Sequence, residues 1–224
     1  MPKSSMTLSS VAAAATRTIR NMRRLAVGQG QWQSMARMAA IDAKGGPLPW
    51  YTYPAIEFLR SFDFTRCDIF EFGAGNSSQF WAGKSRRIVS VEDDENWYNR
   101  VSRIAKPNQQ VLHRPTENEY VGALTSQQAH FDVIIVDGKW RKRCVEQAIE
   151  HLRDEGMIVL DNSDWYPESC RLLRDRGFFQ IDFSGFGPIN AYCWTTSMFI
   201  RAPGRLQYGF TGPTPVGGIR QSAD

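Results

Sequence analysis

The chain has few cysteines and no long apolar run. Its 224 residues include four cysteines, which lie far apart: Cys67, Cys144, Cys170 and Cys193. Cysteines without close spacing argue against a zinc site or a disulfide framework, and they favour a reducing compartment. No apolar stretch approaches the roughly 18–20 residues that a membrane span needs, so we expect no transmembrane helix.

Acidic residues are missing from the first 41 positions. Six of the 27 Lys and Arg residues lie there, namely Lys3, Arg17, Arg20, Arg23, Arg24 and Arg37. The other 21 lie in residues 42–224 together with all 23 acidic residues, so the excess positive charge of the chain is N-terminal. On a helical wheel one face is apolar and the arginines lie opposite; that face holds Val11, Ala15, Ile19, Met22, Leu25 and Ala26. Three interpretations remain: a helix packed on the domain, an organelle-targeting segment, or a contact with a membrane surface or nucleic acid.

From residue 67 onward, apolar strand patterns alternate with helical ones. This alternation predicts a parallel sheet with helices on both faces. We expect strands at 67–72, 87–92, 109–113, 131–137 and 156–161, with helices at 77–84, 94–105, 119–129, 142–153 and 166–176. Two further strand patterns, 178–183 and 193–201, have no helix between them and so indicate an antiparallel hairpin.

The predicted fold class is therefore α/β, a Rossmann-like seven-stranded, mostly parallel sheet with a terminal antiparallel hairpin. We divide the chain into a basic helical extension (1–45), one domain (46–202) and a Gly/Pro-rich tail (203–224). The tail carries so many glycines and prolines that we expect no regular structure in it.

The first strand of the alternating region runs into Glu71-Phe-Gly73-Ala-Gly75. Gly73 and Gly75 permit a tight turn and the close approach of a ligand to the backbone. The second strand ends on Glu92, at the roughly 20-residue spacing at which a carboxylate can accept the hydroxyls of a ribose. The pattern is half of a mononucleotide-binding unit.

The third glycine of the dinucleotide fingerprint is absent, and Asn76, Ser77 and Ser78 stand at that end. A pyrophosphate would disfavour a carboxylate at position 71, whereas a cationic ligand tolerates it. The Glu-x-Gly-x-Gly pattern, together with the terminal hairpin, resembles the class I methyltransferases that use S-adenosyl-L-methionine (SAM). The resemblance covers roughly residues 50–202 and implies SAM as the cofactor. The implied cofactor-binding residues are Glu71, Gly73, Ala74, Gly75, Asn76, Ser77, Ser78, Glu92, Asp93 and Asp137.

A second, partial resemblance concerns metal. Asp137 and the pair Asp161-Asn162 end neighbouring predicted strands, which looks like the Mg²⁺ site of the catechol- and caffeoyl-CoA-type O-methyltransferases. That family has a catalytic lysine three residues after the first Asp, where this chain has Trp140, and Lys139 is one residue short. We take Asp137 and Lys139 as candidate catalytic residues. In the alternative, Asp137 binds the SAM amino group and Asp161-Asn162 caps a loop.

Aromatic side chains cluster before the first strand and beside the later turns. Trp50, Tyr51, Tyr53, Trp140 and Trp165 are candidates for an acceptor pocket, although packing of the N-terminal segment is an equal explanation for any one of them. The basic run 139–143 stands at the predicted start of a helix, where its positive charges oppose the helix dipole. It suggests either an anionic acceptor or a salt-bridged, solvated turn. His113 and His130 are general-base candidates by residue type alone.

The sequence thus predicts a SAM-dependent methyltransferase that acts on oxygen or nitrogen of a small molecule. One alternative is a catalytically silent SAM- or nucleotide-binding subunit of the same fold, and another is an NAD-dependent oxidoreductase. Nucleic-acid methylation is disfavoured because no Asn/Asp-Pro-Pro-Tyr motif is present. We expect a cytoplasmic location, or an organelle if residues 1–26 are a targeting segment.

Overall fold

A seven-stranded mixed sheet forms the centre of the molecule. The computed structural model describes residues 7–201 and 207–208. The strand order is β4-β3-β2-β5-β6-β8-β7, and β8 runs in the direction opposite to the other six strands of this sheet. The strands are β2 (Asp68–Phe72), β3 (Arg87–Glu92), β4 (Gln109–His113), β5 (Phe131–Val136), β6 (Leu152–Leu160), β7 (Phe179–Gly185) and β8 (Trp194–Ile200). The predicted fold class, including the terminal hairpin, is confirmed.

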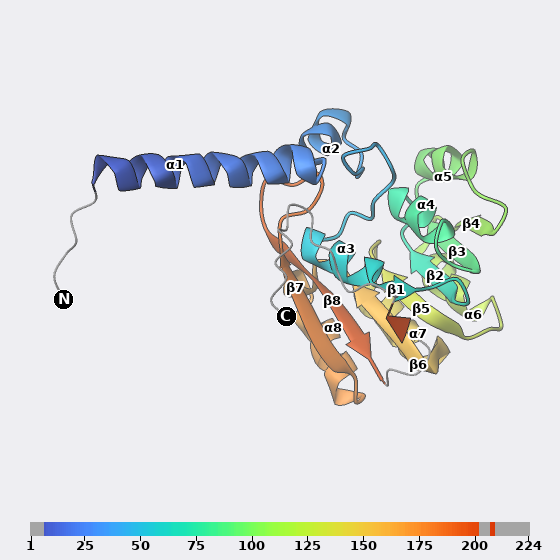
Figure 1. Cartoon of the computed structure of the whole chain (residues 1–224). Helices are drawn as coiled ribbons and strands as arrows, with labels where there is room; N and C mark the ends of the chain where they lie inside the picture. The colour runs from blue at the N-terminus through green and yellow to red at the C-terminus, as the bar shows by residue number, and fades with distance from the viewer. Residues whose placement is uncertain (1–6, 202–206, 209–224) are drawn as a thin grey trace.

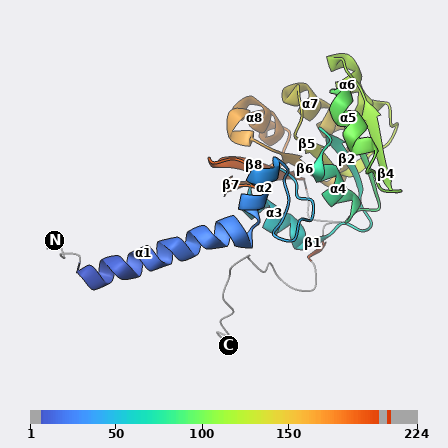
Figure 2. The same cartoon turned by 90° about the horizontal axis from the view of Figure 1, so that it is seen from above.

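Helices cover both faces of this sheet (Figures 1 and 2). On one face α3 (Tyr53–Arg60) and α4 (Asn76–Ala82) share a hydrophobic cluster with the strands. On the other face a second cluster includes α6 (Glu117–Thr125), α7 (Arg141–His151) and α8 (Pro167–Asp175). Strands between two helix layers have no solvent face, which is why every residue of β2 and of β5 is buried.

The strand order places the switch point of the sheet between β2 and β5. From β2 the chain proceeds outward to β3 and then β4, and it returns to the other side of β2 with β5. The connections after β2 and β5 therefore diverge to opposite faces. Ligands of open α/β sheets bind in the resulting crevice, beyond the carboxyl ends of the strands.

Two features of the backbone differ from the prediction. Strand β6 begins at Leu152 rather than at residue 156, because Leu152 already pairs with Phe131 ahead of a register shift. A short strand β1 (Phe62–Asp63) pairs antiparallel with β9 (Gln207–Tyr208). The expectation of no regular structure in the tail is thus wrong at these two positions, since main-chain pairing needs no apolar pattern. The other residues from 203 onward lie outside the described part of the chain.

The N-terminal helix does not pack on the domain. Helix α1 (Leu8–Arg23) continues through a π-helical turn η1 (Arg24–Gly28) into α2 (Gln31–Arg37). No side chain of α1 is buried by any described residue, and Leu25 in η1 is where the predicted apolar face first contacts the core. The packed-helix interpretation is therefore wrong for α1. None of the described helices is long and apolar enough to cross a bilayer.

Candidate active site

The two glycines of the turn after β2 have different roles. Gly73 has a φ of +97°, and a Cβ there would lie 3.0–3.1 Å from backbone atoms of Asp137 and Gly138. Only glycine lets this turn pack against the turn after β5. Gly75 has extended backbone, and no described atom lies closer than 3.8 Å to a Cβ built on it. Its lack of a side chain leaves space at the crevice and does not relieve strain.

This difference predicts that alanine at one position destabilises the fold strongly and that alanine at the other has almost no effect. Gly73→Ala combines left-handed strain with a backbone clash, so we expect it to lower the free energy of unfolding by about 3 kcal/mol. Gly75→Ala should change that free energy by less than about 0.5 kcal/mol. Urea denaturation of both variants measures the contrast. Equal losses from the two substitutions would contradict this account of the turn.

Glu71 supports the turn from below. Its side chain is fully buried, and its Oε2 accepts hydrogen bonds from Ser78 Oγ (2.5 Å) and Ser90 Oγ (2.7 Å). Ser78 Oγ in turn accepts the N–H of Gly75 at 3.0 Å. Burial raises the pKa of Glu71 to about 7, although the serine hydroxyls oppose the shift. Within the described part of the chain neither Glu71 nor Ser78 lines the cavity, so both positions act on it through the turn.

The raised pKa makes stability depend on pH. The folded state holds this proton up to about pH 7, whereas an unfolded glutamate releases it near pH 4.3. The contribution of Glu71 is therefore lost as pH rises between these values, up to about 3 kcal/mol. Glu71→Gln, which resembles the protonated acid, should be more stable than wild type at pH 8 and equally stable at pH 4. Thermal melts across this range test it, with Glu95→Gln on the surface as the matched control. A pH profile unchanged in Glu71→Gln would contradict the assignment.

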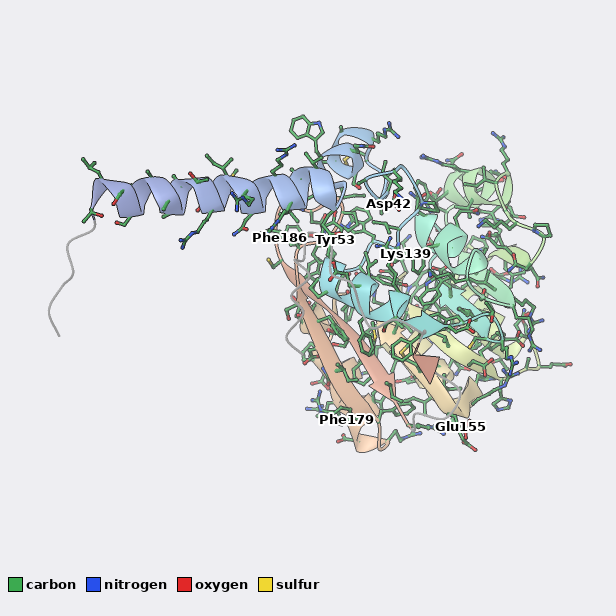
Figure 3. The ribbon with its side chains drawn as sticks, in the orientation of Figure 1. Asp42, Tyr53, Lys139, Glu155, Phe179 and Phe186 are labelled. Carbon is green, nitrogen blue, oxygen red and sulfur yellow. The ribbon has the colours of Figure 1, made fainter. Side chains whose placement is uncertain are left out.

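A cavity of about 470 Å³ opens at the carboxyl edge of the sheet, a volume within the ordinary range for ligand pockets. Figure 3 shows Lys139 at this edge and Glu155 at the opposite one. The structure brings most of the predicted site residues to its wall: Trp50, Gly73, Ala74, Gly75, Asn76, Ser77, Glu92, Asp93, Asp137, Lys139, Asp161, Asn162 and Trp165.

Three aromatic candidates lie elsewhere. Tyr51 and Tyr53 are buried in the core beneath α3. Trp140 has a left-handed backbone, with φ of 49° and ψ of 37°, and this turns its ring onto Tyr120 at a centroid distance of 5.2 Å. None of the three lines the cavity among the described residues. Their contacts are those of the packing alternative, and their assignment to the acceptor pocket gains no support from this cavity.

Glu92 is held as a hydrogen-bond acceptor at the cavity wall. Its Oε2 accepts the N–H of Ala74 at 3.0 Å, and its Oε1 accepts the N–H groups of Asp93 and Asp94 at 3.1 Å each. These bonds fix the carboxylate and leave Oε2 a free lone pair. The side chain is 8% exposed, and burial raises its pKa.

Asp137 and Asp161 form a buried acidic pair at the ends of β5 and β6. Burial raises the pKa of Asp161 to about 6, even though its Oδ1 accepts hydrogen bonds from Trp194 Nε1 (3.0 Å) and Thr196 Oγ1 (2.5 Å). Burial and then the charge of Asp161 raise the pKa of Asp137. Both shifts arise first from burial, which disfavours the charged carboxylate, and for Asp137 the neighbouring Asp161 adds to the shift.

Arg141 binds side-chain oxygens of two of the three residues that the metal interpretation assigned to Mg²⁺, Asp137 and Asn162, and the main-chain oxygen of the third, Asp161. Its five N–H groups reach Gly138 O (2.9 Å), Asp161 O, Asn162 Oδ1 (3.0 Å), Asp137 O (3.3 Å) and Asp137 Oδ1 (3.2 Å). The guanidinium thereby joins the ends of β5 and β6 and uses all of its donors. No cluster of three His, Cys, Asp or Glu with metal-binding geometry occurs in the described ranges. The residues present do not fit a divalent cation.

The other cations of this turn are also engaged. Lys139 Nζ donates to Asp93 Oδ2 at 2.5 Å, which raises the lysine pKa and keeps the amine protonated. Lys139 is therefore unsuited to act as a general base. Arg143 pairs with Glu117 at 3.0 Å, outside the cavity wall. The salt-bridged explanation of the basic run fits these contacts better than an anionic acceptor.

Neither candidate histidine lines the cavity among the described residues. His113 stacks on Tyr98 at 5.2 Å, with Nε2 against the carbonyl oxygen of Asp93 at 3.3 Å. His130 precedes β5, at the opposite edge of the sheet, and lies 6.1 Å from the ring of His151. The protonatable groups that do face the cavity from the β5 and β6 ends are Asp137 and Asp161.

Several wall residues escaped the sequence prediction: Met38, Ala39, Ala40, Leu48, Trp97, Arg100, Tyr120, Ile189, Asn190, Tyr192 and Trp194. Trp97 Nε1 donates to Ala74 O at 2.5 Å, so the indole borders the glycine turn. Trp165 and Tyr192 lie with ring centroids 6.3 Å apart at the mouth, and each is about half exposed. The mouth of the cavity is therefore aromatic, and its floor is acidic.

Comparison with solved structures identifies the architecture. An rRNA methylase from Streptococcus thermophilus superposes with a TM-score of 0.50 at 15% identity, covering 66% of this chain and 96% of that one. A putative O-methyltransferase from Klebsiella pneumoniae gives 0.50 at 15% identity, covering 67% and 78%. The chain has the class I methyltransferase fold. No protein-family model and no curated sequence matches it. In this methyltransferase fold, the acidic cavity lies at the edge where the sheet order reverses.

Proposed function

We propose that this chain is a SAM-dependent methyltransferase that transfers a methyl group to oxygen or nitrogen of a small-molecule acceptor. The observation that carries the proposal is the excess of buried carboxyl groups beside the glycine turn. Asp137 and Asp161 line the cavity, Glu71 lies just below the turn, and burial raises the pKa of all three carboxyl groups. Such a floor favours a ligand that carries positive charge and disfavours a pyrophosphate.

The residues beside the glycine turn fit SAM at one half of the cavity. Glu92 Oε2 has a lone pair for a ribose hydroxyl, and the bare Cα of Gly75 leaves room beside it. Asp137 lies across the turn from Gly73 and suits an ammonium group. Bound here, SAM supplies a methyl group on a sulfonium, which an acceptor oxygen or nitrogen takes by in-line displacement.

The protein would contribute mainly alignment and proton removal. Trp50, Trp165 and Tyr192 line the same cavity and can hold an acceptor while they exclude water. Asp161 faces the same space with a pKa of about 6, so at neutral pH it is a carboxylate able to accept the acceptor's proton. The side-chain oxygens of Asp137 and Asn162 that a metal would need are bonded to Arg141, so we assign no metal to this site.

Calorimetric titration tests the proposal. We expect micromolar binding of SAM and of its demethylated product, no response to NAD, and no effect of Mg²⁺. NAD binding without SAM binding would favour the oxidoreductase alternative. SAM binding without turnover over a broad screen of phenol, carboxylate and amine acceptors would favour a silent SAM-binding subunit. Absence of SAM binding in a folded sample would overturn the proposal.

A further inference from the structure

Helix α1 is an amphipathic helix without a partner. It projects from the domain (Figures 1 and 2), and the side chains along most of its length stand clear of the other drawn elements (Figure 3). Its large apolar side chains are exposed to an unusual degree, with Ile19 at 66% and Met22 at 64%. A helix of 16 residues without tertiary contacts is only marginally stable in water. Something outside the described chain must therefore cover its apolar face.

The two faces of α1 have different chemistry. At about 100° per residue, Leu8, Val11, Ala15, Ile19 and Met22 fall on one side. Arg17 and Arg20 lie on the opposite side, and Arg24 continues that row into η1. A covering partner must accept apolar side chains along one face and compensate the arginines along the other.

The charge distribution indicates that the partner is anionic. No acid occurs before Asp42, so the arginines of α1 have no acidic neighbours in sequence. Residues 42–224 hold 21 basic and 23 acidic residues, so the surplus positive charge lies in residues 1–41, and three of the six basic residues there, Arg17, Arg20 and Arg23, are on α1. Electrostatic attraction to an anionic surface would therefore act on α1 and would orient the protein.

We propose that α1 binds the surface of an anionic lipid bilayer, lying in the interface with its apolar face among the acyl chains. Such a surface is the one partner that satisfies both faces: apolar chains for Ile19 and Met22, and lipid phosphates for Arg17 and Arg20. A nucleic acid would engage the arginines and leave the apolar face in water. A second copy of α1 would cover the apolar face but supply no acid for the arginines, because α1 contains none.

Sedimentation of the full chain with phospholipid vesicles tests the proposal. Binding should be strong to phosphatidylcholine mixed with phosphatidylserine, weak to phosphatidylcholine alone, and reduced by added salt. Arg17→Glu with Arg20→Glu should lower the partition coefficient at least about tenfold. Ile19→Ser with Met22→Ser should do the same. The matched control, Arg66→Glu with Arg103→Glu on exposed parts of the domain, makes the same change in net charge and should retain binding within about twofold.

Each other outcome overturns the proposal. Equal loss in the domain control would mean that net charge alone drives binding. Binding of single-stranded RNA without vesicle binding would assign the helix to nucleic acid. A dimer that Ile19→Ser with Met22→Ser dissociates, again without vesicle binding, would assign the apolar face to a second copy. All variants should keep the melting temperature and SAM affinity of wild type, because none of these residues lines the cavity among the described ones. Failure of this proposal is therefore distinguishable from failure of the proposed function.

Discussion

Glu92→Ala is expected to bind SAM about thirtyfold more weakly than wild type or worse. The carboxylate is fixed at the wall by N–H groups of Ala74, Asp93 and Asp94, so its free lone pair is already aimed for a hydroxyl. A hydrogen bond to a charged acceptor contributes about 2 kcal/mol, which corresponds to that factor. Titration calorimetry with SAM and with its demethylated product measures the loss, and both ligands should lose equally because both carry the ribose.

The neighbouring carboxylate supplies the control. Asp93 also lines the cavity, but its side chain is paired with exposed Lys139. Asp93→Asn should change SAM affinity by less than about threefold, as expected for a solvent-exposed pair. Glu92→Ala also leaves three N–H groups without an acceptor, so the melting temperature of both variants must be recorded. Unchanged affinity in Glu92→Ala, or an equal loss in Asp93→Asn, would move the ribose site elsewhere.

Arg141→Met should destabilise the protein by about 3–5 kcal/mol, the usual cost of leaving a buried charge unpaired. Methionine keeps an unbranched apolar stem but loses the guanidinium that lies 5.0 Å from the centre of the Tyr166 ring. It removes all five N–H groups that tie Asp137, Gly138, Asp161 and Asn162 together. Chemical denaturation at pH 7.5 measures the loss.

A second substitution separates lost charge pairing from lost packing. Adding Asp137→Asn to Arg141→Met should recover part of the lost stability, because the uncompensated carboxylate is then gone. The wild-type melting temperature should also be the same in Mg²⁺ and in EDTA. Stabilisation of wild type by Mg²⁺, or no recovery in the double variant, would contradict the assignment of Arg141 to this position.

The arrangement of the sheet and the placement of many site residues followed from the sequence. Buried strands of a parallel sheet are continuous apolar runs between turn signals, and the observed bounds of β3 and β4 equal the predicted ones. The carboxyl ends of such strands meet at one edge, so Glu92, Asp137 and Asp161 could be expected on a common wall. Their side chains do line one cavity.

What could not be predicted depends on side-chain direction and on loops. Glu71 lies within β2, and the bonds to Ser78 and Ser90 keep it below the turn. Trp140 faces Tyr120 because its backbone is left-handed, which sequence does not reveal for a tryptophan. The sequence places Arg141 in the basic run at the start of a helix. It does not show that the five oxygens bonded to its guanidinium come from the turns after two different strands. The wall residues from 38–48 and 189–194 belong to irregular segments, which carry no periodic signal.

The central claim is that this cavity binds SAM, and a crystal structure with the demethylated product, S-adenosylhomocysteine, tests it most directly. We predict the ribose within hydrogen-bond distance of Glu92 Oε2, the amino-acid end beside Gly73 and Asp137, and the sulfur facing the aromatic mouth formed by Trp165 and Tyr192. A ligand bound away from Glu92, or an empty cavity in crystals grown at saturating ligand, would contradict the account.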